Sequence, residues 1–543
     1  MAGSLLLANM INITTVKRIA YVYLLIPFIL FIFGWLNIIA AVIVFLIIIG
    51  GLVFGWQSMP AEEGMEFKKS DFISLVVVLG VWLLLSGVGG YSFQNWDHHS
   101  RNAVFRDLIN YPWPVLYHLD PAIANQFGVQ PVVILSYYFG FWLPSALVGK
   151  LLGWGVANFS LFMWTYLGIV LSIVLTALKL RLSFLKAALL VIFFSGMDFV
   201  GVLLLQNVPG YTYPHLWPPI QHLEWWAGSL QYSSFTTELY WTYNQFVPAL
   251  LIMSLLVTAS NIKKDVFLAG LCFFFAPLPA LGMLPFVGGR LIDEIYKLIS
   301  DKLPRSWTGI ILQRVFTIEN LTGVMIGSIA LLFFSTNLSA QSRSFGLPAS
   351  PAVYVLFLLL EWLLMWFLLL PGNKNDWTWY VAGFFLVFAP FVNFGGSWDF
   401  MMRTTIPALY ILMLGCARFL ETNKSVIPRA VILGFLFLGA LTPIYEINRS
   451  IVRTVRYDFP SLSPFVFDQY FKHPPSIAQS FVPEFDHPNT LTADEWISVS
   501  IPGPEGWTTK VGNLFSPPFR FLLKEDLICD NQIGPGVLSQ CTP

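Results

Sequence analysis

The strongest constraint on the fold of this chain is a succession of long apolar segments. A helix that crosses a membrane needs about 20 mainly apolar residues, and twelve runs of roughly that length are present. They lie at 19–35, 37–55, 72–90, 157–178, 184–205, 241–260, 265–288, 319–337, 351–371, 376–394, 404–420 and 429–447. Only 11% of the 543 residues are charged, against about 25% in soluble domains. We therefore expect an all-α polytopic membrane protein with about 11–13 transmembrane helices.

Charge and motif content exclude several classes of function. The chain carries 30 basic and 30 acidic residues, and this balance argues against nucleic acid as a partner. It has no P-loop, no Rossmann glycine fingerprint, no HExxH pair and no GxSxG elbow. These motifs mark nucleotide-dependent enzymes, zinc proteases and serine hydrolases, so no sequence motif requires a cofactor.

Basic residues between the apolar segments predict the orientation, because Lys and Arg in short loops stay on the cytoplasmic side. They occur at 17–18, 68–69, 179–186, 263–264, 374 and 424–429. Placing them inside puts the N-terminus in the cytoplasm and the C-terminus outside, in what we expect to be the plasma membrane of a bacterium. The outer loops are then 90–156, 206–240, 338–350 and 395–403. All seven histidines fall on the outer side, so we expect the polar chemistry there.

Two apolar segments are predicted not to cross the membrane. Residues 131–153 contain Pro144 and Lys150, and the orientation makes them a partly embedded juxtamembrane helix on the outer side. Residues 265–288 contain three prolines and precede a basic stretch. We expect them to enter and return as a broken hairpin, which is tolerated where irregular backbone is buried in protein or lines a cavity.

The chain is expected to divide into a transmembrane domain, 1–447, and a small, irregular extracytoplasmic cap, 448–543. The cap is polar and rich in proline. A loop-rich segment of about 100 residues is marginally stable alone, so it should pack on the membrane domain. Cys529 and Cys541 lie in it and suit a disulfide in an oxidising compartment, with two unrelated free thiols as the alternative.

A charged stretch, NWDHHSRNAVFRDLI, lies in the first outer loop. In a helix built from it, Val104 and Leu108 lie on one side and Arg101 on the other, which predicts an amphipathic helix at the membrane interface. Asp97 near its start either caps the helix or acts as a general base on an acceptor hydroxyl.

The two histidines beside this acid raise the question of a metal site. Adjacent helical residues diverge by about 100°, so His98 and His99 rarely share one ion, whereas Asp97 and His99 would meet in an extended segment. No HxH or HxxxH spacing supports a metal elsewhere. We expect no metal site, with a divalent cation on Asp97 and His99 as the alternative. His98, His99 and Arg101 are assigned to substrate binding.

A second cluster, between residues 215 and 240, combines aromatic and polar side chains. Sugars stack on aromatic rings, and their hydroxyls need many hydrogen-bond partners. An aromatic belt at the membrane interface is the alternative, but it explains the polar members less well. We therefore assign this cluster to a carbohydrate site formed by His222, Glu224, Trp225 and Gln231.

A third cluster, GGSWDFMMR, ends at Arg403. An Arg at the outer end of a span can bind a phosphate oxygen or a carboxylate. We assign Asp399 and Arg403 to substrate binding, with snorkelling of Arg403 to the interface and a simple pair between the two side chains as the alternatives. Asp198 and Glu361 lie inside apolar segments, where acids are costly and often functional, although Glu361 would also serve to pair helices.

These stretches resemble the GT-C superfamily of membrane glycosyltransferases. NWDHHSRNAVFRDLI is similar to the acidic motif and juxtamembrane helix in the first outer loop of oligosaccharyltransferases, protein O-mannosyltransferases and aminoarabinose transferases. YYFGFWLPSALVGKLLGWGVANFS is similar to their second juxtamembrane element, and RTTIPALY to a late helix start of bacterial members. The similarity covers the membrane core and not the tail.

The resemblance implies a polyprenyl-phosphate sugar donor and an inverting transfer, with or without a metal, on the outer face. Asp97 would deprotonate the acceptor hydroxyl, and Arg403 would neutralise the departing phosphate. Two extra spans precede the acidic loop, and the WWD motif and the acidic pair of the protein-modifying members are absent. The acceptor is therefore expected to be lipid-linked or a polysaccharide.

Three functions stay open from the sequence. The first is such a glycosyltransferase, with the lipid donor, a glycan or lipid-linked acceptor and membrane lipids as partners. The second is a transporter or flippase of lipid-linked saccharide, which typically has internal repeats and a midplane site. The third is a noncatalytic envelope-assembly subunit whose tail binds a partner.

Overall fold

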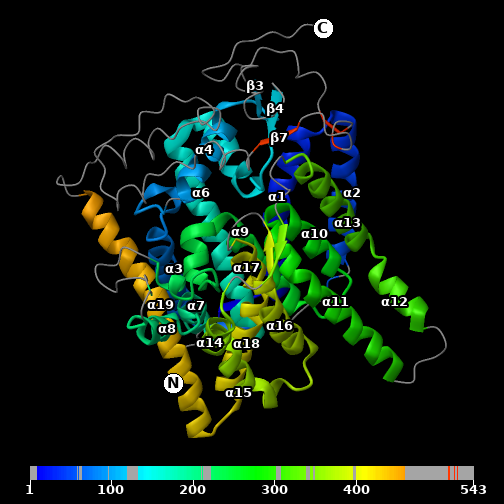
Figure 1. The fold of residues 1–543 in the computed structure, drawn as a ribbon. Helices are drawn as coiled ribbons and strands as arrows, with labels where there is room; N and C mark the ends of the chain where they lie inside the picture. The colour runs from blue at the N-terminus through cyan, green and yellow to red at the C-terminus, as the bar shows by residue number, and fades with distance from the viewer. Residues whose placement is uncertain are drawn as a thin grey trace, which may run out of the picture.

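The apolar segments form helices throughout the computed structural model (Figure 1). The structure describes residues 9–57, 59, 64–95, 97–118, 132–208, 211, 222–300, 307–337, 343–346, 349–394, 399–458, 511–513, 519 and 522–523. The chain is mostly helical, which confirms the predicted all-α membrane class.

The helices differ widely in length. They are α1 (Ile13–Trp35), α2 (Ile38–Gln57), α3 (Lys69–Leu84), α4 (Asp97–Asn110), α6 (Leu143–Leu180), α7 (Phe184–Phe193), α8 (Asp198–Leu205), α9 (Phe235–Thr258), α10 (Asp265–Phe275), α11 (Pro277–Ser300), α12 (Trp307–Val315), α13 (Ile318–Phe334), α14 (Pro351–Leu358), α15 (Leu364–Asn373), α16 (Trp377–Phe388), α17 (Asp399–Thr404), α18 (Ile406–Thr422) and α19 (Val426–Asp458). A π-helical turn, Leu359–Leu363, joins α14 to α15. Short 3₁₀ turns occur at Val88–Gly90, Gly140–Trp142, Leu223–Trp226 and Ala389–Phe391.

Short strands pair at three places. They are β1 (Asn9–Ile11), β2 (Met65–Phe67), β3 (Leu116–His118), β4 (Val132–Leu135), β5 (Arg343–Phe345), β6 (Val392–Phe394) and β7 (Val511–Asn513). β1 pairs with β2, β5 pairs with β6, and β3, β4 and β7 form an antiparallel sheet in that order.

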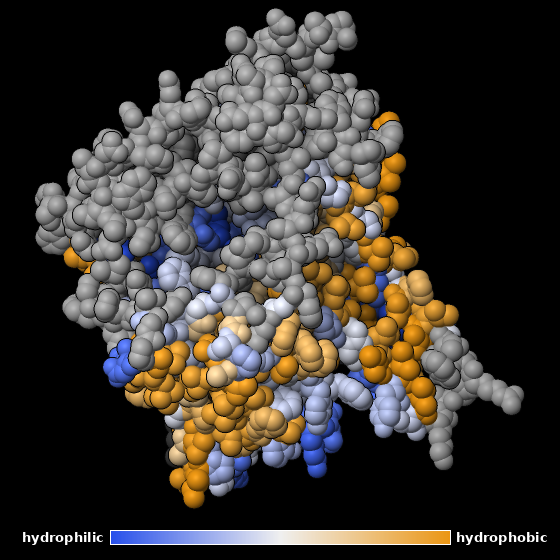
Figure 2. All heavy atoms as spheres, viewed as in Figure 1, coloured by the Kyte–Doolittle hydropathy of each residue, from blue (hydrophilic) through white to orange (hydrophobic). Residues whose placement is uncertain are grey.

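Seven helices in the described part of the chain are long and apolar enough to cross a membrane, or eight if the bent pair α12–α13 forms one span. This number is lower than the 11–13 expected, because several apolar runs form helices that are too short. α3 and α18 have 16 and 17 residues, and α10 and α16 have 11 and 12. Figure 2 shows apolar side chains over much of the lower flanks of the molecule, and Leu46, Phe384 and Phe437 are more than half exposed. Such a surface is typical of an integral membrane protein.

The segment 131–153 differs from the single juxtamembrane helix that was expected. It contains β4, a 3₁₀ turn and the first eleven residues of α6. Gly153 breaks α6 with a φ of 84°, in the left-handed region that glycine tolerates. The break falls between the predicted juxtamembrane part and the predicted span, and the part before it packs on α4.

The proline-rich segment 265–288 forms a hairpin of α10 and α11, which meet at Ala276. The Arg290 Nε donates to the Asp265 carboxylate at 2.6 Å, so the two ends of the hairpin lie at the same end of the helical bundle. A course that enters the membrane and returns stays a prediction from the proline pattern. α10 also packs tightly on α13, where Gly270 faces Gly323.

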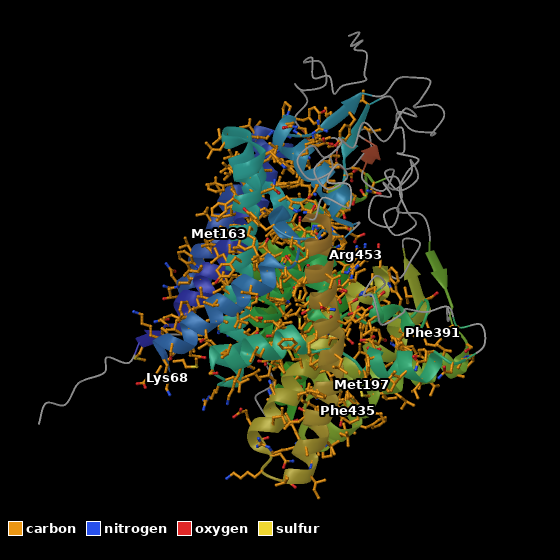
Figure 3. All side chains as sticks on the ribbon, turned by 90° about the vertical axis from the view of Figure 1, so that its left-hand side faces the viewer. Lys68, Met163, Met197, Phe391, Phe435 and Arg453 are labelled. Carbon is orange, nitrogen blue, oxygen red and sulfur yellow. The ribbon has the colours of Figure 1, made fainter. Side chains whose placement is uncertain are left out.

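One end of the bundle carries α4, β3, β4 and β7 and is called the α4 end (Figure 1). α19 runs past residue 447 to Asp458, and Figure 3 shows it rising from Phe435 in the lower part of the molecule towards the α4 end at Arg453. The few described residues of the tail contact the α4 end, and the cap as a domain stays a prediction. β7 pairs with β4, and Asn37 N–H donates to the carbonyl of Leu522 at 2.7 Å.

Candidate functional site

The α4 helix is buried on both sides, which corrects the prediction that its charged side meets water. Arg101, Asn102 and Asp107, on the predicted polar side, are 0–3% exposed. Asp107 accepts a hydrogen bond from the Tyr117 hydroxyl of β3 at 2.7 Å. The prediction failed because the periodicity of a sequence shows only the two sides of the helix itself. It does not show that β3, from a later segment, covers the polar side.

The side chain of Asp97 forms an ion pair. The Arg101 Nη2 donates to the Asp97 Oδ2 at 2.8 Å, and the Asp97 side chain keeps about a third of its surface, 32%, exposed. Burial would raise the pKa of Asp97, but the positive charges of Arg101 and Arg403 lower it overall. Asp97 is therefore a carboxylate at neutral pH and remains accessible.

Arg403, at the end of α17, is buried and does not snorkel. Its guanidinium donates to Asp399 at 2.8 Å and to the Tyr138 hydroxyl at 3.0 Å. Its Nε has no hydrogen-bond partner among the described residues. Burial would lower the pKa of Arg403, but Asp399, the neighbouring tyrosines and Asp97 raise it well above its ordinary value. The side chain is a permanent cation with one unused donor.

The fold brings Asp97 and Arg403 together from distant parts of the sequence. The two side chains lie close enough for the charge of each to shift the pKa of the other, and Arg101 interacts with both charges. Glu238 of α9 is buried beside them and interacts with the charges of Arg403 and Asp399. We call Asp97, Arg101, Asp399 and Arg403 the charged site.

Among the described residues, no group of three or more His, Cys, Asp or Glu side chains is arranged to hold an ion. The His98 Nε2 lies 2.8 Å from the Tyr240 carbonyl, and its ring stacks on Tyr243. The side chain of His99 lies outside the described residues, so the Asp97–His99 alternative is not addressed. Cys529 and Cys541 lie outside them as well.

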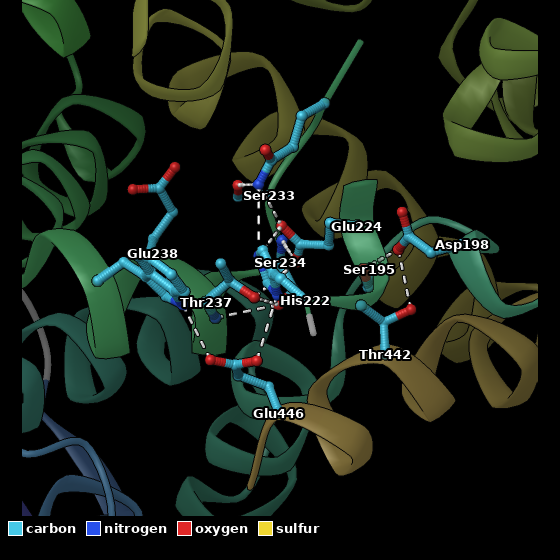
Figure 4. A network of polar contacts seen from close by, with 12 residues as sticks. Ser195, Asp198, His222, Glu224, Ser233, Ser234, Thr237, Glu238, Thr442 and Glu446 are labelled. Carbon is cyan, nitrogen blue, oxygen red and sulfur yellow. Dashed lines mark hydrogen bonds and ion pairs between the residues drawn. The ribbon is translucent and has the colours of Figure 1, made fainter. Parts of the chain in front are cut away.

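His222 lies between two carboxylates in a buried cluster (Figure 4). Its Nε2 is 3.3 Å from Glu224 and its Nδ1 is 3.3 Å from Glu446 of α19. Burial would lower the pKa of His222, but Glu446 and Glu224 raise it to about 9. His222 is therefore an imidazolium at neutral pH and neutralises part of the buried negative charge.

Hydrogen bonds from the protein occupy the Glu224 carboxylate. It accepts from the Thr237 hydroxyl at 2.6 Å, the Ser234 N–H at 2.9 Å and the Gln231 amide at 3.0 Å. Burial would raise the pKa of Glu224, but His222 and these donors lower it. The structure thus brings His222, Glu224 and Gln231 together, as part of an internal network rather than an open surface for sugar hydroxyls.

Two tryptophans of this region differ in their surroundings. Trp225 is partly exposed, and its ring contacts His222. Trp226 is fully buried, and its indole N–H donates to Asp198 at 3.1 Å and to Glu361 at 3.0 Å. Trp226 is therefore not part of an aromatic belt. Its indole N–H links Asp198 of α8 to Glu361 of the π-helical turn, so these two acids join neighbouring helices.

Trp241 connects the His222 cluster to the charged site. Its indole N–H donates to Glu446 at 2.9 Å, and its carbonyl accepts a hydrogen bond from Arg101. Arg449 donates to Glu446 at 2.8 and 3.0 Å and also to Asn95, just before α4.

Glu446, Arg449 and Tyr138 were not identified from the sequence. Glu446 and Arg449 are three residues apart at the end of the last apolar run, which places them on one helix face. That spacing was the one local signal that could have indicated an ion pair between them. Their partners just before α4 and near His222 are more than 200 residues away, so no local pattern reveals them.

Comparison with protein-family models, with curated proteins and with solved structures finds no match.

Proposed function

We propose that this protein is a GT-C-like membrane glycosyltransferase that uses a polyprenyl-phosphate sugar donor. The observation that carries the proposal is the charged site, in which an accessible carboxylate, Asp97, lies within the electrostatic range of a buried arginine, Arg403. A base and a phosphate-binding cation at one end of a helical membrane bundle are the two groups that this transfer requires.

In the proposed reaction, Asp97 accepts the proton of an acceptor hydroxyl as its oxygen bonds to the anomeric carbon of the sugar. The bond between the anomeric carbon and the phosphate oxygen breaks, and its electron pair stays on the lipid phosphate. Arg403 neutralises that charge and offers its unused Nε donor. A single displacement inverts the anomeric configuration. A lipid-linked or polysaccharide acceptor fits the expectation from the sequence.

Asp97→Asn tests this proposal, because the substitution removes the base and keeps the size of the side chain. We expect transfer from undecaprenyl-phosphate-linked hexoses or pentoses, measured in proteoliposomes, to fall about 10²–10⁴-fold. Arg403→Gln should lower it about 10²–10³-fold. Asp107→Asn is the matched control, because Asp107 is a buried acid on the same helix that accepts a hydrogen bond from Tyr117, and its transfer activity should stay within about twofold of the wild type.

Full activity of Asp97→Asn would show that Asp97 is not the base. If the protein moved a lipid-linked saccharide across the proteoliposome membrane without transferring the sugar, the transporter hypothesis would be favoured over the glycosyltransferase. Loss of function on tail deletion, with Asp97→Asn tolerated, would favour an assembly subunit.

A further inference from the structure

A cavity of about 350 Å³ lies at the end of the bundle opposite the charged site. It is formed where α6, α9, α11, α16 and α18 end or turn. Val257 lines it on α9, and Trp241, which contacts the charged site, is sixteen residues earlier on that helix. About 24 Å of helix separates the two, so the cavity is a separate site.

Cations outnumber acids around this cavity. Its lining includes Lys179, Arg290, Lys297 and Arg418, against Asp293 and Asp376. Arg290 is already neutralised within the protein, because it donates hydrogen bonds to the Asp265 carboxylate and to the carbonyl of Asn261. Lys297 pairs with Asp293 one turn away at 2.5 Å.

The other two cations are poorly neutralised. Arg418 lies 3.6 Å from Asp376, the longest ion pair in the described part of the chain, and is 44% exposed. Lys179 is exposed, and no carboxylate of the described residues lies within ion-pair distance of it. Lys179 is repelled most strongly by Arg418, then by Arg290 and Lys17, and these repulsions exceed its attraction to Asp376. Like charges held together across a cavity are relieved by an anion between them.

The remaining lining matches a ligand larger than a bare anion. The volume lies at the lower limit of small-molecule sites, about 300–1,000 Å³. Asn373 and Asn375 offer amide groups, and Trp377, which is 47% exposed, offers a ring face. Phosphate oxygens accept hydrogen bonds from Lys, Arg and amide donors.

We propose that this cavity binds a phosphate group, which Lys179 and Arg418 hold from two different helices. The group belongs either to a soluble phosphorylated molecule or to the headgroup of an anionic lipid. The site does not depend on the proposed transferase reaction, and binding alone tests it.

The test uses the purified full chain and two probes at constant ionic strength. The first is inorganic pyrophosphate, and the second is phosphatidic acid in mixed micelles, with phosphatidylcholine as the neutral reference. Binding is measured as the rise in thermal-unfolding temperature with probe concentration. We expect Lys179→Gln and Arg418→Gln each to raise the apparent Kd at least about tenfold.

Lys424→Gln is the matched control, because Lys424 is an exposed cation that does not line the cavity. It should bind as the wild type does, and Arg418→Lys should retain part of the affinity. Response to pyrophosphate identifies a soluble ligand, and response to phosphatidic acid alone identifies a lipid headgroup. The proposal fails if the wild type responds to neither probe, or if the Lys179→Gln and Arg418→Gln variants respond like the wild type.

Discussion

At the scale of single residues, the least expected feature is the charged His222 in the interior. A buried imidazolium is costly unless carboxylates surround it, and Glu224 and Glu446 do so. Since Glu446 also holds Arg449 and Trp241, the charge on His222 helps to fix α19 against the segments around Trp226 and α9.

The pKa of His222 predicts how stability depends on pH. Its value of about 9 lies above the ordinary 6.5 of an unfolded chain, so the folded state binds the proton more tightly. The stabilisation is complete below pH 6.5 and is lost as the pH rises through about 9. It amounts to about 3 kcal/mol. The measurement is the thermal-unfolding temperature of the detergent-purified protein between pH 6 and 10.

His222→Gln supplies the comparison. The variant should unfold at a lower temperature than the wild type at pH 6, and the difference should shrink towards pH 10. If the variant lowered the unfolding temperature equally at pH 6 and pH 10, His222 would carry no extra proton in the folded protein.

At the scale of helices and strands, close contact between small residues sets the packing of α10 on α13. A Cβ atom built on Gly270 would lie 2.1 Å from the Gly323 carbonyl oxygen, and neither backbone has room to yield. Small residues allow such close approach between helices in membranes.

Gly270→Ala should therefore separate α10 from α13 and destabilise the fold by about 1–3 kcal/mol. Gly327→Ala is the control on the same interface, because its Cβ would lie 3.6 Å from Gly270, an ordinary contact. Thermal unfolding of both variants measures the difference. A Gly270→Ala protein as stable as the Gly327→Ala protein would contradict the tight packing.

The sequence predicts the elements better than their ends. Most apolar runs became helices, because run length and hydropathy are local properties. The run 184–205 breaks at Gly196, where a Cβ would collide with Glu361 and the Met197 N–H bonds to the Leu360 carbonyl. That break depends on a helix 160 residues later. The buried polar side of α4 and the Glu446 pair depend on distant segments for the same reason.

The charged site was partly predictable. Asp97, Asp399 and Arg403 stood out because charge is rare in this chain, and the structure brings them together. His222, Glu224 and Gln231 also stood out, but their rarity did not reveal that they bind one another. The sequence therefore identifies unusual polar residues. Only the fold shows whether such a residue binds a neighbouring side chain or is available to a ligand.

At the scale of the whole molecule, the charged site and the cavity lined by Lys179 and Arg418 lie at opposite ends of the bundle. If basic residues stay inside, the α4 end faces outward. In a background without the four native cysteines, Asn110→Cys should react with a membrane-impermeant maleimide in intact cells. Lys424→Cys should react only after permeabilisation. Both positions are exposed, so the reverse pattern would invert the orientation.

The sheet at the α4 end also has a consequence for biosynthesis. β4 lies between β3, which precedes it closely, and β7, which follows about 380 residues later. Until the ribosome has delivered β7, one edge of β4 has no strand to pair with, and unpaired edges attract foreign strands. The α4 end is thus completed only after every helix has been translated, and a nascent chain would need its open edge shielded until then.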